Sequence, residues 1–80
     1  MKLLKGSVVI AEAGRDRGGY FVVLDSDEKY SLIADGKSRK LADPKRKNNR
    51  HIRVTNSMID VNDITDKKLR NTLKQFSDAE

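Results

Sequence analysis

The sequence predicts an all-β domain, a small five-stranded barrel, followed by a C-terminal α-helix. Three observations support this prediction. Short runs of β-branched and apolar residues alternate with glycine-rich or polar turns over the first fifty-five residues. The chain has 80 residues, of which twenty are Leu, Ile, Val or Phe, enough for one small core and not for two. After Thr65 the apolar residues change to a helical spacing.

The first two strands are expected at residues 7–13 and 20–24, with the sequences SVVIAEA and YFVVL. Between them, GRDRGG places three glycines in six positions, which is typical of a tight turn. The second strand is apolar without a break, so both of its faces are expected to be covered. The acids after it, Asp25, Asp27 and Glu28, are interpreted as turn residues, since the glycine and the distant glutamate of a calcium loop are absent.

The third strand is expected at residues 30–34 (YSLIA), ending at Asp35-Gly36. An Asp-Gly pair between strand-like segments favours a type I′ hairpin turn, which would return the chain through residues 37–41 as a fourth strand. Asp43-Pro44 then ends that strand, because proline has no N–H for a sheet ladder. The polar residues 45–50 are predicted to be a loop.

A fifth strand is expected at residues 51–55 (HIRVT), and residues 56–63 are predicted to be a connector. Leu69, Leu73 and Phe76 recur at i, i+4 and i+7, and Thr65 or Asp63 is placed to cap the helix. The chain is therefore divided into a barrel at 1–62 and an amphipathic helix at 63–80. We expect the apolar stripe of the helix to cover one outer side of the sheet, and docking on another molecule is the alternative.

The net charge of +5 is concentrated in one part of the chain. Residues 37–53 hold eight Lys or Arg and one acid, a net +7, whereas residues 1–36 and 54–80 each have a net −1. A solvated basic face normally interleaves acids, and this segment hardly does. The segment therefore predicts a contact surface for a polyanion, and nucleic acid is the leading candidate.

The predicted binding residues are the cations of this segment, its histidine and two asparagines, and two arginines of the glycine turn. They are Arg15, Arg17, Lys37, Arg39, Lys40, Lys45, Arg46, Lys47, Asn48, Asn49, Arg50, His51 and Arg53. Arginine and lysine neutralise phosphates, and asparagine can bond sugar hydroxyls or base edges. Two interpretations of Arg15-Asp16-Arg17 stay open: a phosphate-binding loop, or an Arg–Asp pair that settles the turn. For Tyr20, Phe21 and Tyr30, core packing is favoured over base stacking.

No catalytic constellation is present, so we predict a protein that is not an enzyme and has no metal site, cofactor or small-molecule substrate. The single histidine, His51, has no evident carboxylate partner, and the chain has no cysteine for a thiolate site or a disulfide. No apolar run suits a signal peptide or a membrane span, so a cytoplasmic location is expected.

Residues 5–25, KGSVVIAEAGRDRGGYFVVLD, resemble a KOW motif, with Gly6, Gly14, Arg15, Arg17 and Gly18 as the matching positions. The longer stretch 4–55 is similar to small bacterial KOW-domain RNA-binding proteins related to large-subunit ribosomal proteins of archaea and eukaryotes. The resemblance implies an SH3-like barrel and an RNA- or ribosome-related role in translation. The helix lies outside the motif, and Tyr20 stands where the motif usually has another glycine.

The sequence thus predicts a non-catalytic protein that binds RNA, and ribosomal RNA is the leading candidate. Ribosomal proteins are candidates for further contacts. The alternative is a protein-docking module that uses the barrel edge or the Leu69–Leu73–Phe76 stripe. Attachment to an anionic membrane through the helix cations Lys67, Lys68, Arg70 and Lys74 is not expected, because the apolar face is narrow.

Overall fold

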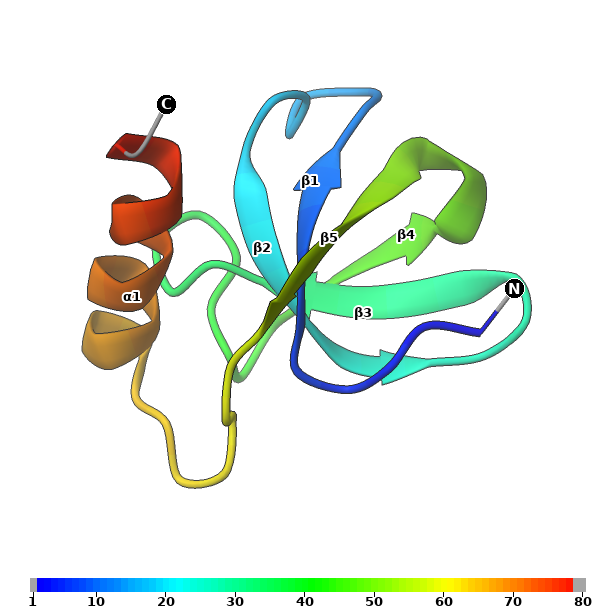
Figure 1. Ribbon diagram of the computed structural model, residues 1–80. Helices are drawn as coiled ribbons and strands as arrows, with labels where there is room; N and C mark the ends of the chain where they lie inside the picture. The colour runs from blue at the N-terminus through cyan, green and yellow to red at the C-terminus, as the bar shows by residue number, and fades with distance from the viewer. Residues whose placement is uncertain (1, 79–80) are drawn as a thin grey trace.

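The computed structural model describes residues 2–78 and consists of one curled sheet, one α-helix and a short 3-10 helix (Figure 1). In chain order the elements are β1 (Ser7–Ala11), β2 (Tyr20–Ser26), β3 (Tyr30–Ala34), β4 (Lys45–Asn48), the 3-10 helix η1 (Asn49–His51), β5 (Ile52–Met58) and α1 (Asp66–Asp78). All neighbouring strands are antiparallel, in the order β4-β3-β2-β1-β5.

The two strands at the ends of this order, β4 and β5, are joined by η1 alone. Since η1 has only three residues, the sheet has to bend until its two ends meet at that corner. This is the strand arrangement of an SH3-like barrel, although the sheet does not close by pairing β4 with β5. The predicted all-β class, with a small five-stranded barrel and a C-terminal helix, is confirmed.

The inner face of the curled sheet carries the main core. Val9 is the cross-strand partner of Phe21, and Val23 is the partner of Ile33, so these side chains share one face. All four are 2% exposed or less, and they form one cluster with Leu3, Ala11 and Ile52. Side chains alternate along a strand, so the residues between them point to the outer face.

The outer face is covered by α1, as the sequence predicts. Val8, Val22 and Ala34 lie side by side on that face, and Leu69 and Leu73 of the helix are buried against them. Figure 1 shows α1 standing against this side of the barrel. The apolar stripe of the helix is therefore used inside the molecule, and of the two interpretations of the stripe the structure favours the internal one.

The start of α1 is fixed by side chains that the sequence partly identifies. The hydroxyl of Thr65 accepts the N–H of Lys68 at 3.1 Å, which is the N-cap interaction expected for Thr65. The carboxylate of Asp66 accepts the N–H of Leu41 at 2.8 Å, so the first turn of α1 is tied to the loop after β3. Phe76 lies at the other end of the helix, where its ring stacks on Tyr20 with the centroids 6.5 Å apart.

The prediction for the chain after β3 is wrong. Residues 37–41 form no strand, and the segment predicted as a loop contains β4. Gly36 has a φ of 75°, but Asp35 has no positive φ, so the turn is not type I′. Instead, one carboxylate oxygen of Asp35 accepts the N–H groups of Lys37 and Arg39, which holds a wide loop over residues 35–44.

The fifth strand exists but is longer than predicted. It begins at Ile52 and runs to Met58, so the first three residues of the predicted connector belong to the strand. Val54 and Met58 on this strand are 43% and 54% exposed.

Candidate nucleic-acid interface

The basic residues 37–53 do not form one surface loop. They occupy the 35–44 loop, β4, η1 and the start of β5, and the exposure of their side chains differs from one position to the next. Lys37, Lys40, Arg46, Arg50 and Arg53 are exposed, whereas Arg39 and Lys45 are half-buried and Lys47 is buried.

Strand alternation explains why Lys47 is buried. Lys45 and Lys47 are paired with Ile33 and Ser31 on the inner face, whereas Arg46 is paired with Leu32 and lies on the outer face. The Nζ atom of Lys47 donates to the carbonyl oxygen of Ala13 at 2.6 Å, and the residue is only 8% exposed. Lys47 therefore links β4 to the β1–β2 turn and is not available to a surface partner.

The two asparagines are also committed to the fold. The side chain of Asn48 accepts the N–H of Arg50 at 2.9 Å and caps η1. The side chain of Asn49 accepts the hydroxyl of Ser31 at 2.6 Å and donates to the carbonyl oxygen of Asp27 at 2.9 Å. Their predicted role in RNA binding gains no support from these contacts, which give both amides a structural role.

The β1–β2 turn is joined to the 35–44 loop by an ion pair. The guanidinium of Arg39 donates from Nε and Nη2 to the two carboxylate oxygens of Asp16, at 3.3 and 3.1 Å. Such two-point pairing fixes the relative orientation of the two groups. Asp16 is therefore paired with an arginine of another segment and not with Arg15 or Arg17 of its own turn. Arg15 and Arg17 are exposed and have no ion pair within residues 2–78.

On its other side the same turn meets η1. The N–H of Glu12 donates to the carbonyl oxygen of His51 at 2.8 Å. The β1–β2 turn therefore contacts the 35–44 loop on one side and η1 on the other, while η1 also contacts the β2–β3 turn through Asn49. The exposed basic residues of the β1–β2 turn, the 35–44 loop and η1, with the histidine, are called the basic rim here, and its members are Arg15, Arg17, Lys37, Lys40, Arg50 and His51.

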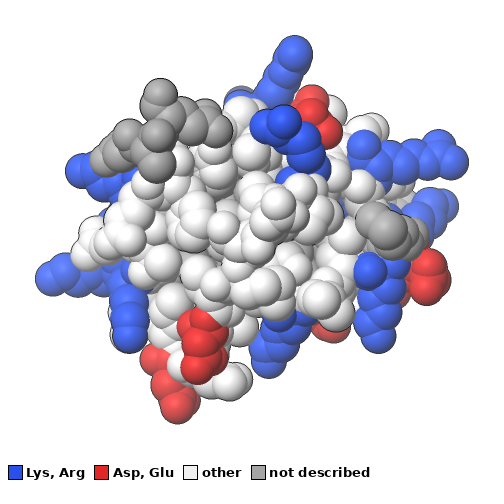
Figure 2. Space-filling model, in the orientation of Figure 1, with Lys and Arg blue, Asp and Glu red and all other residues white. Residues whose placement is uncertain are grey.

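The acids near the basic rim compensate it only in part. Asp16 is paired with Arg39, and Asp35 is occupied by backbone N–H groups. Glu12 and Asp43 are the exposed acids on these segments, and the exposed Glu28 of the β2–β3 turn lines a pocket together with Arg50. Figure 2 shows lysine and arginine side chains projecting around the periphery of the molecule, including the end that carries the β1–β2 turn, while the centre of this face is uncharged.

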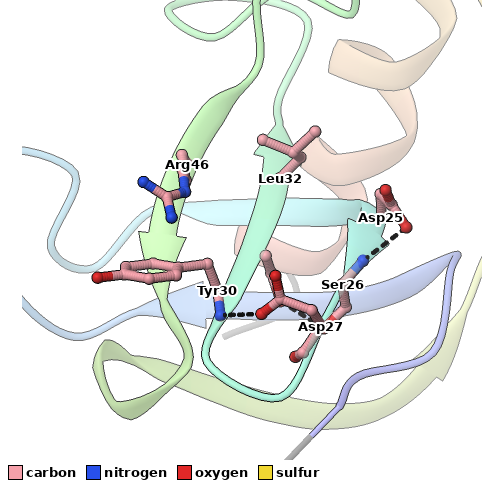
Figure 3. A pocket seen from close by; sticks show the side chains of 7 residues that line it. Asp25, Ser26, Asp27, Tyr30, Leu32 and Arg46 are labelled. Carbon is pink, nitrogen blue, oxygen red and sulfur yellow. Dashed lines mark hydrogen bonds between the residues drawn. The ribbon is translucent and has the colours of Figure 1, made fainter.

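Arg46 lies outside the basic rim, in a shallow pocket of about 230 Å³ (Figure 3). Its guanidinium carbon is 3.8 Å from the centroid of the Tyr30 ring, a cation–π arrangement that covers one face of the ring. The carboxylates of Asp25 and Asp27 belong to the same pocket. With carboxylates this close, the pocket is a poorer place for phosphate than the basic rim.

The aromatic side chains follow the packing interpretation. Phe21 is 2% exposed in the inner core, and Tyr20 packs on Phe76 of α1. Tyr30 is half-buried, with one face of its ring under Arg46.

The carboxylate of Asp27 organises the turn between β2 and β3. One of its oxygens accepts the N–H of Tyr30 at 2.7 Å and that of Lys29 at 2.8 Å, and these bonds lower its pKa below the ordinary 3.8, with a smaller contribution from Arg46. A carboxyl whose pKa is lowered by folding stabilises the fold above its unfolded pKa, and this contribution is lost as pH falls through the lower folded pKa.

We therefore expect the free energy of unfolding to fall on acidification below pH 3.8, partly through Asp27. Asp27→Asn removes this titrating group, so its stability is expected to depend less on pH in that window. Urea titrations at a series of acidic pH values measure the difference, with Glu28→Gln as the matched control on the same turn. Identical pH profiles for wild type and Asp27→Asn contradict the assignment.

Two cations outside the predicted set also lie near the basic rim. Arg70 and Lys74 of α1 line a groove together with Lys37 and the end of the β1–β2 turn. From the sequence alone, both are candidates only for membrane attachment. Their i, i+4 spacing, which places them on one face of the helix, is the signal that could have associated them with a site.

Among residues 2–78 there is no cluster of His, Asp or Glu that could hold a metal ion. In the same part of the chain, no helix has the length and apolar character required to cross a membrane.

The comparisons with known proteins leave the family open. No protein-family model matches the chain, and no curated protein sequence is similar to it. The resemblance of residues 5–25 to a KOW motif therefore stays a prediction.

Proposed function

We propose that this chain is a non-catalytic RNA-binding protein that acts with structured RNA in the cytoplasm, ribosomal RNA being the first candidate. The supporting observation is the basic rim, in which exposed cations come from the β1–β2 turn and from the two segments that this turn contacts. Each segment is fixed by internal contacts, through Asp16–Arg39, Lys47 to Ala13 and Glu12 to His51. Cations on a rigid surface neutralise phosphates without a large ordering cost.

The fold favours RNA shape over base sequence as the feature that is recognised. Lys and Arg of the basic rim are suited to phosphates, which carry no sequence information. Among the described residues there is one α-helix, α1, so the two packed helices of a helix-turn-helix, the common reader of the DNA major groove, are not present there. A structured RNA presents phosphates and 2′-hydroxyls on a wide, shallow minor groove that such a surface can reach.

The test is the salt dependence of RNA binding. Each phosphate contact contributes about 0.7–0.9 to the slope of log affinity against log salt concentration. The double variant Arg15→Gln/Arg17→Gln is expected to weaken binding to an RNA hairpin and to lower that slope by about 1.4–1.8. Fluorescence anisotropy with a labelled hairpin, repeated over a series of salt concentrations, gives both quantities.

Lys67→Gln/Lys68→Gln is the matched control, because it removes the same charge from two exposed residues of α1. Its slope is expected to stay close to that of the wild type. If the two double variants have the same slope, the basic rim is not the binding surface. Crosslinking the protein to RNA in cells and sequencing the bound fragments then identifies the RNA, and ribosomal RNA enriched at one position is the expected result.

A second candidate is protein docking at the edge of the barrel. It is favoured by the exposed Val54 and Met58 on the end strand β5, whose outer edge has no partner strand among residues 2–78. The centre of the face in Figure 2 is uncharged, which suits a protein better than an RNA. A wild-type chain that fails to bind RNA at low salt would favour this candidate.

A further inference from the structure

A groove runs between α1 and the barrel, next to the basic rim. Its volume is about 570 Å³, within the range of ligand-binding clefts. One wall is formed by Arg70, Asn71 and Lys74 of α1, and the other by the Gly18–Gly19 end of the β1–β2 turn and by Lys37.

The groove is positively charged. Lys37, Arg70 and Lys74 line it, and Asp35 is its one acidic lining residue. Lys37 and Lys74 are exposed and have no ion pair within the described residues. Asp35 already accepts two backbone N–H groups, so its charge is partly satisfied within the loop. The arrangement is suited to an anion.

The walls of the groove are fixed to each other. Nη1 of Arg70 donates to the carbonyl oxygen of Gly36 at 3.0 Å, which leaves the remaining guanidinium N–H groups for a ligand. Gly36 lies so close to the backbone of Asp66 that a Cβ atom would not fit, and Asp66 also holds the N–H of Leu41. The groove is therefore formed before any ligand arrives, which lowers the cost of binding.

The opposite wall is open and partly apolar. A Cβ atom added to Gly18 would meet no atom within 4 Å, so the backbone there can be approached closely. Tyr20 lines the groove as well, with its ring stacked on Phe76, and Leu73 of the facing helix is only 4% exposed. The groove therefore offers cations and an open backbone, which suit the phosphates and sugars of a nucleotide chain more than its bases.

We propose that this groove binds the backbone of a single-stranded RNA segment that continues from the structured RNA on the basic rim. The inference rests on the proposed function and extends it. Lys37 belongs to both surfaces, so the path of phosphates is continuous from the basic rim into the groove. A concave groove can hold a single RNA strand, whereas a duplex is wider and is contacted more easily by the exposed side chains of the basic rim.

The test compares three labelled RNAs with the same hairpin: one blunt, one with eight uridines on its 3′ end, and one with eight uridines on its 5′ end. The wild-type chain is expected to bind a tailed hairpin about tenfold more tightly than the blunt one at low salt. Lys74→Glu is expected to remove that gain and to leave the affinity for the blunt hairpin almost unchanged.

Lys68→Glu is the matched control, since Lys68 is an exposed lysine on the same helix and does not line the groove. It reverses the same charge and is expected to keep the gain from the tail. Circular dichroism checks that both variants retain the helix, so that a loss of binding reports on the groove.

The outcomes separate the inference from the proposed function. If the wild type binds the blunt hairpin but neither tail adds affinity, or if Lys68→Glu loses the gain as Lys74→Glu does, the groove inference is overturned and the RNA-binding proposal stands. If the wild type binds none of the three RNAs, both are overturned.

Discussion

Leu69→Ala is expected to lower the free energy of unfolding by about 3 kcal/mol, within the range for buried leucines. Leu69 is 0% exposed and packs with Val8, Val22 and Ala34 on the outer face of the sheet. Its replacement by alanine removes buried methyl groups and leaves a cavity between α1 and the barrel. Urea titrations followed by circular dichroism measure the change.

Lys68→Ala is the control for Leu69→Ala, because Lys68 is exposed on the same turn of the helix and alanine is a good helix former. It is expected to change stability by less than about 0.5 kcal/mol. If Leu69→Ala also costs so little, α1 is not an integral part of the folded domain, and its apolar stripe has to be reconsidered as a docking surface.

Gly36→Ala is expected to destabilise the fold by at least about 2 kcal/mol, since it adds a steric clash to backbone strain. The φ of Gly36 is 75°, a region that residues with a Cβ atom rarely adopt. The new methyl group would also meet the backbone of Asp66 and the backbone nitrogen of Arg70. The 35–44 loop and the first turn of α1 would have to separate.

Gly18→Ala separates the two causes. Gly18 has a φ of 85°, yet a Cβ atom there meets nothing within 4 Å. This variant is therefore expected to lose about 1 kcal/mol from backbone strain alone. Thermal or urea unfolding of both variants gives the comparison, and equal losses would mean that Gly36 is required for its φ and not for its contact with α1.

The strands that could be predicted from the sequence are those with apolar patterns. Residues 7–11, 20–24 and 30–34 carry runs of valine, isoleucine and aromatic residues, which favour strands wherever they are packed. The helix was predictable for the same reason, because Leu69, Leu73 and Phe76 have a helical spacing and Thr65 can cap the first turn. Burial on both faces of β2 also followed from its unbroken apolar run.

The fourth strand could not be predicted in this way. Lys45–Asn48 reads KRKN, which contains no apolar residue to show the alternation of inside and outside. Asp35-Gly36 indicated a tight hairpin, but the Asp35 carboxylate holds the N–H groups of Lys37 and Arg39 and widens the turn. The return strand therefore forms later, beyond Pro44, where β3 still has a free edge to pair with.

The segment that supplies most of the candidate site could be predicted from the sequence, but the roles of its individual residues could not. The charge pattern identified the segment that supplies most of the basic rim, but the roles of its members depend on contacts between distant residues. Lys47 bonds to Ala13, Arg39 pairs with Asp16, and Asn49 bonds to Ser31. None of these contacts leaves a local sequence signal, so the structural roles of Lys47, Arg39 and Asn49 could not be predicted from the sequence.

The composition of β4 also affects how the folded protein behaves at high concentration. Because the sheet is not closed, β4 is an edge strand whose outer backbone groups have no neighbouring strand in the described chain. An exposed edge is a template on which a second molecule can add a strand and begin aggregation. Arg46, the exposed cation of this strand, opposes that, since it would bring like charges together when two such edges approach each other. The charge and the lack of apolar residues at this edge are therefore expected to disfavour strand addition by a second copy.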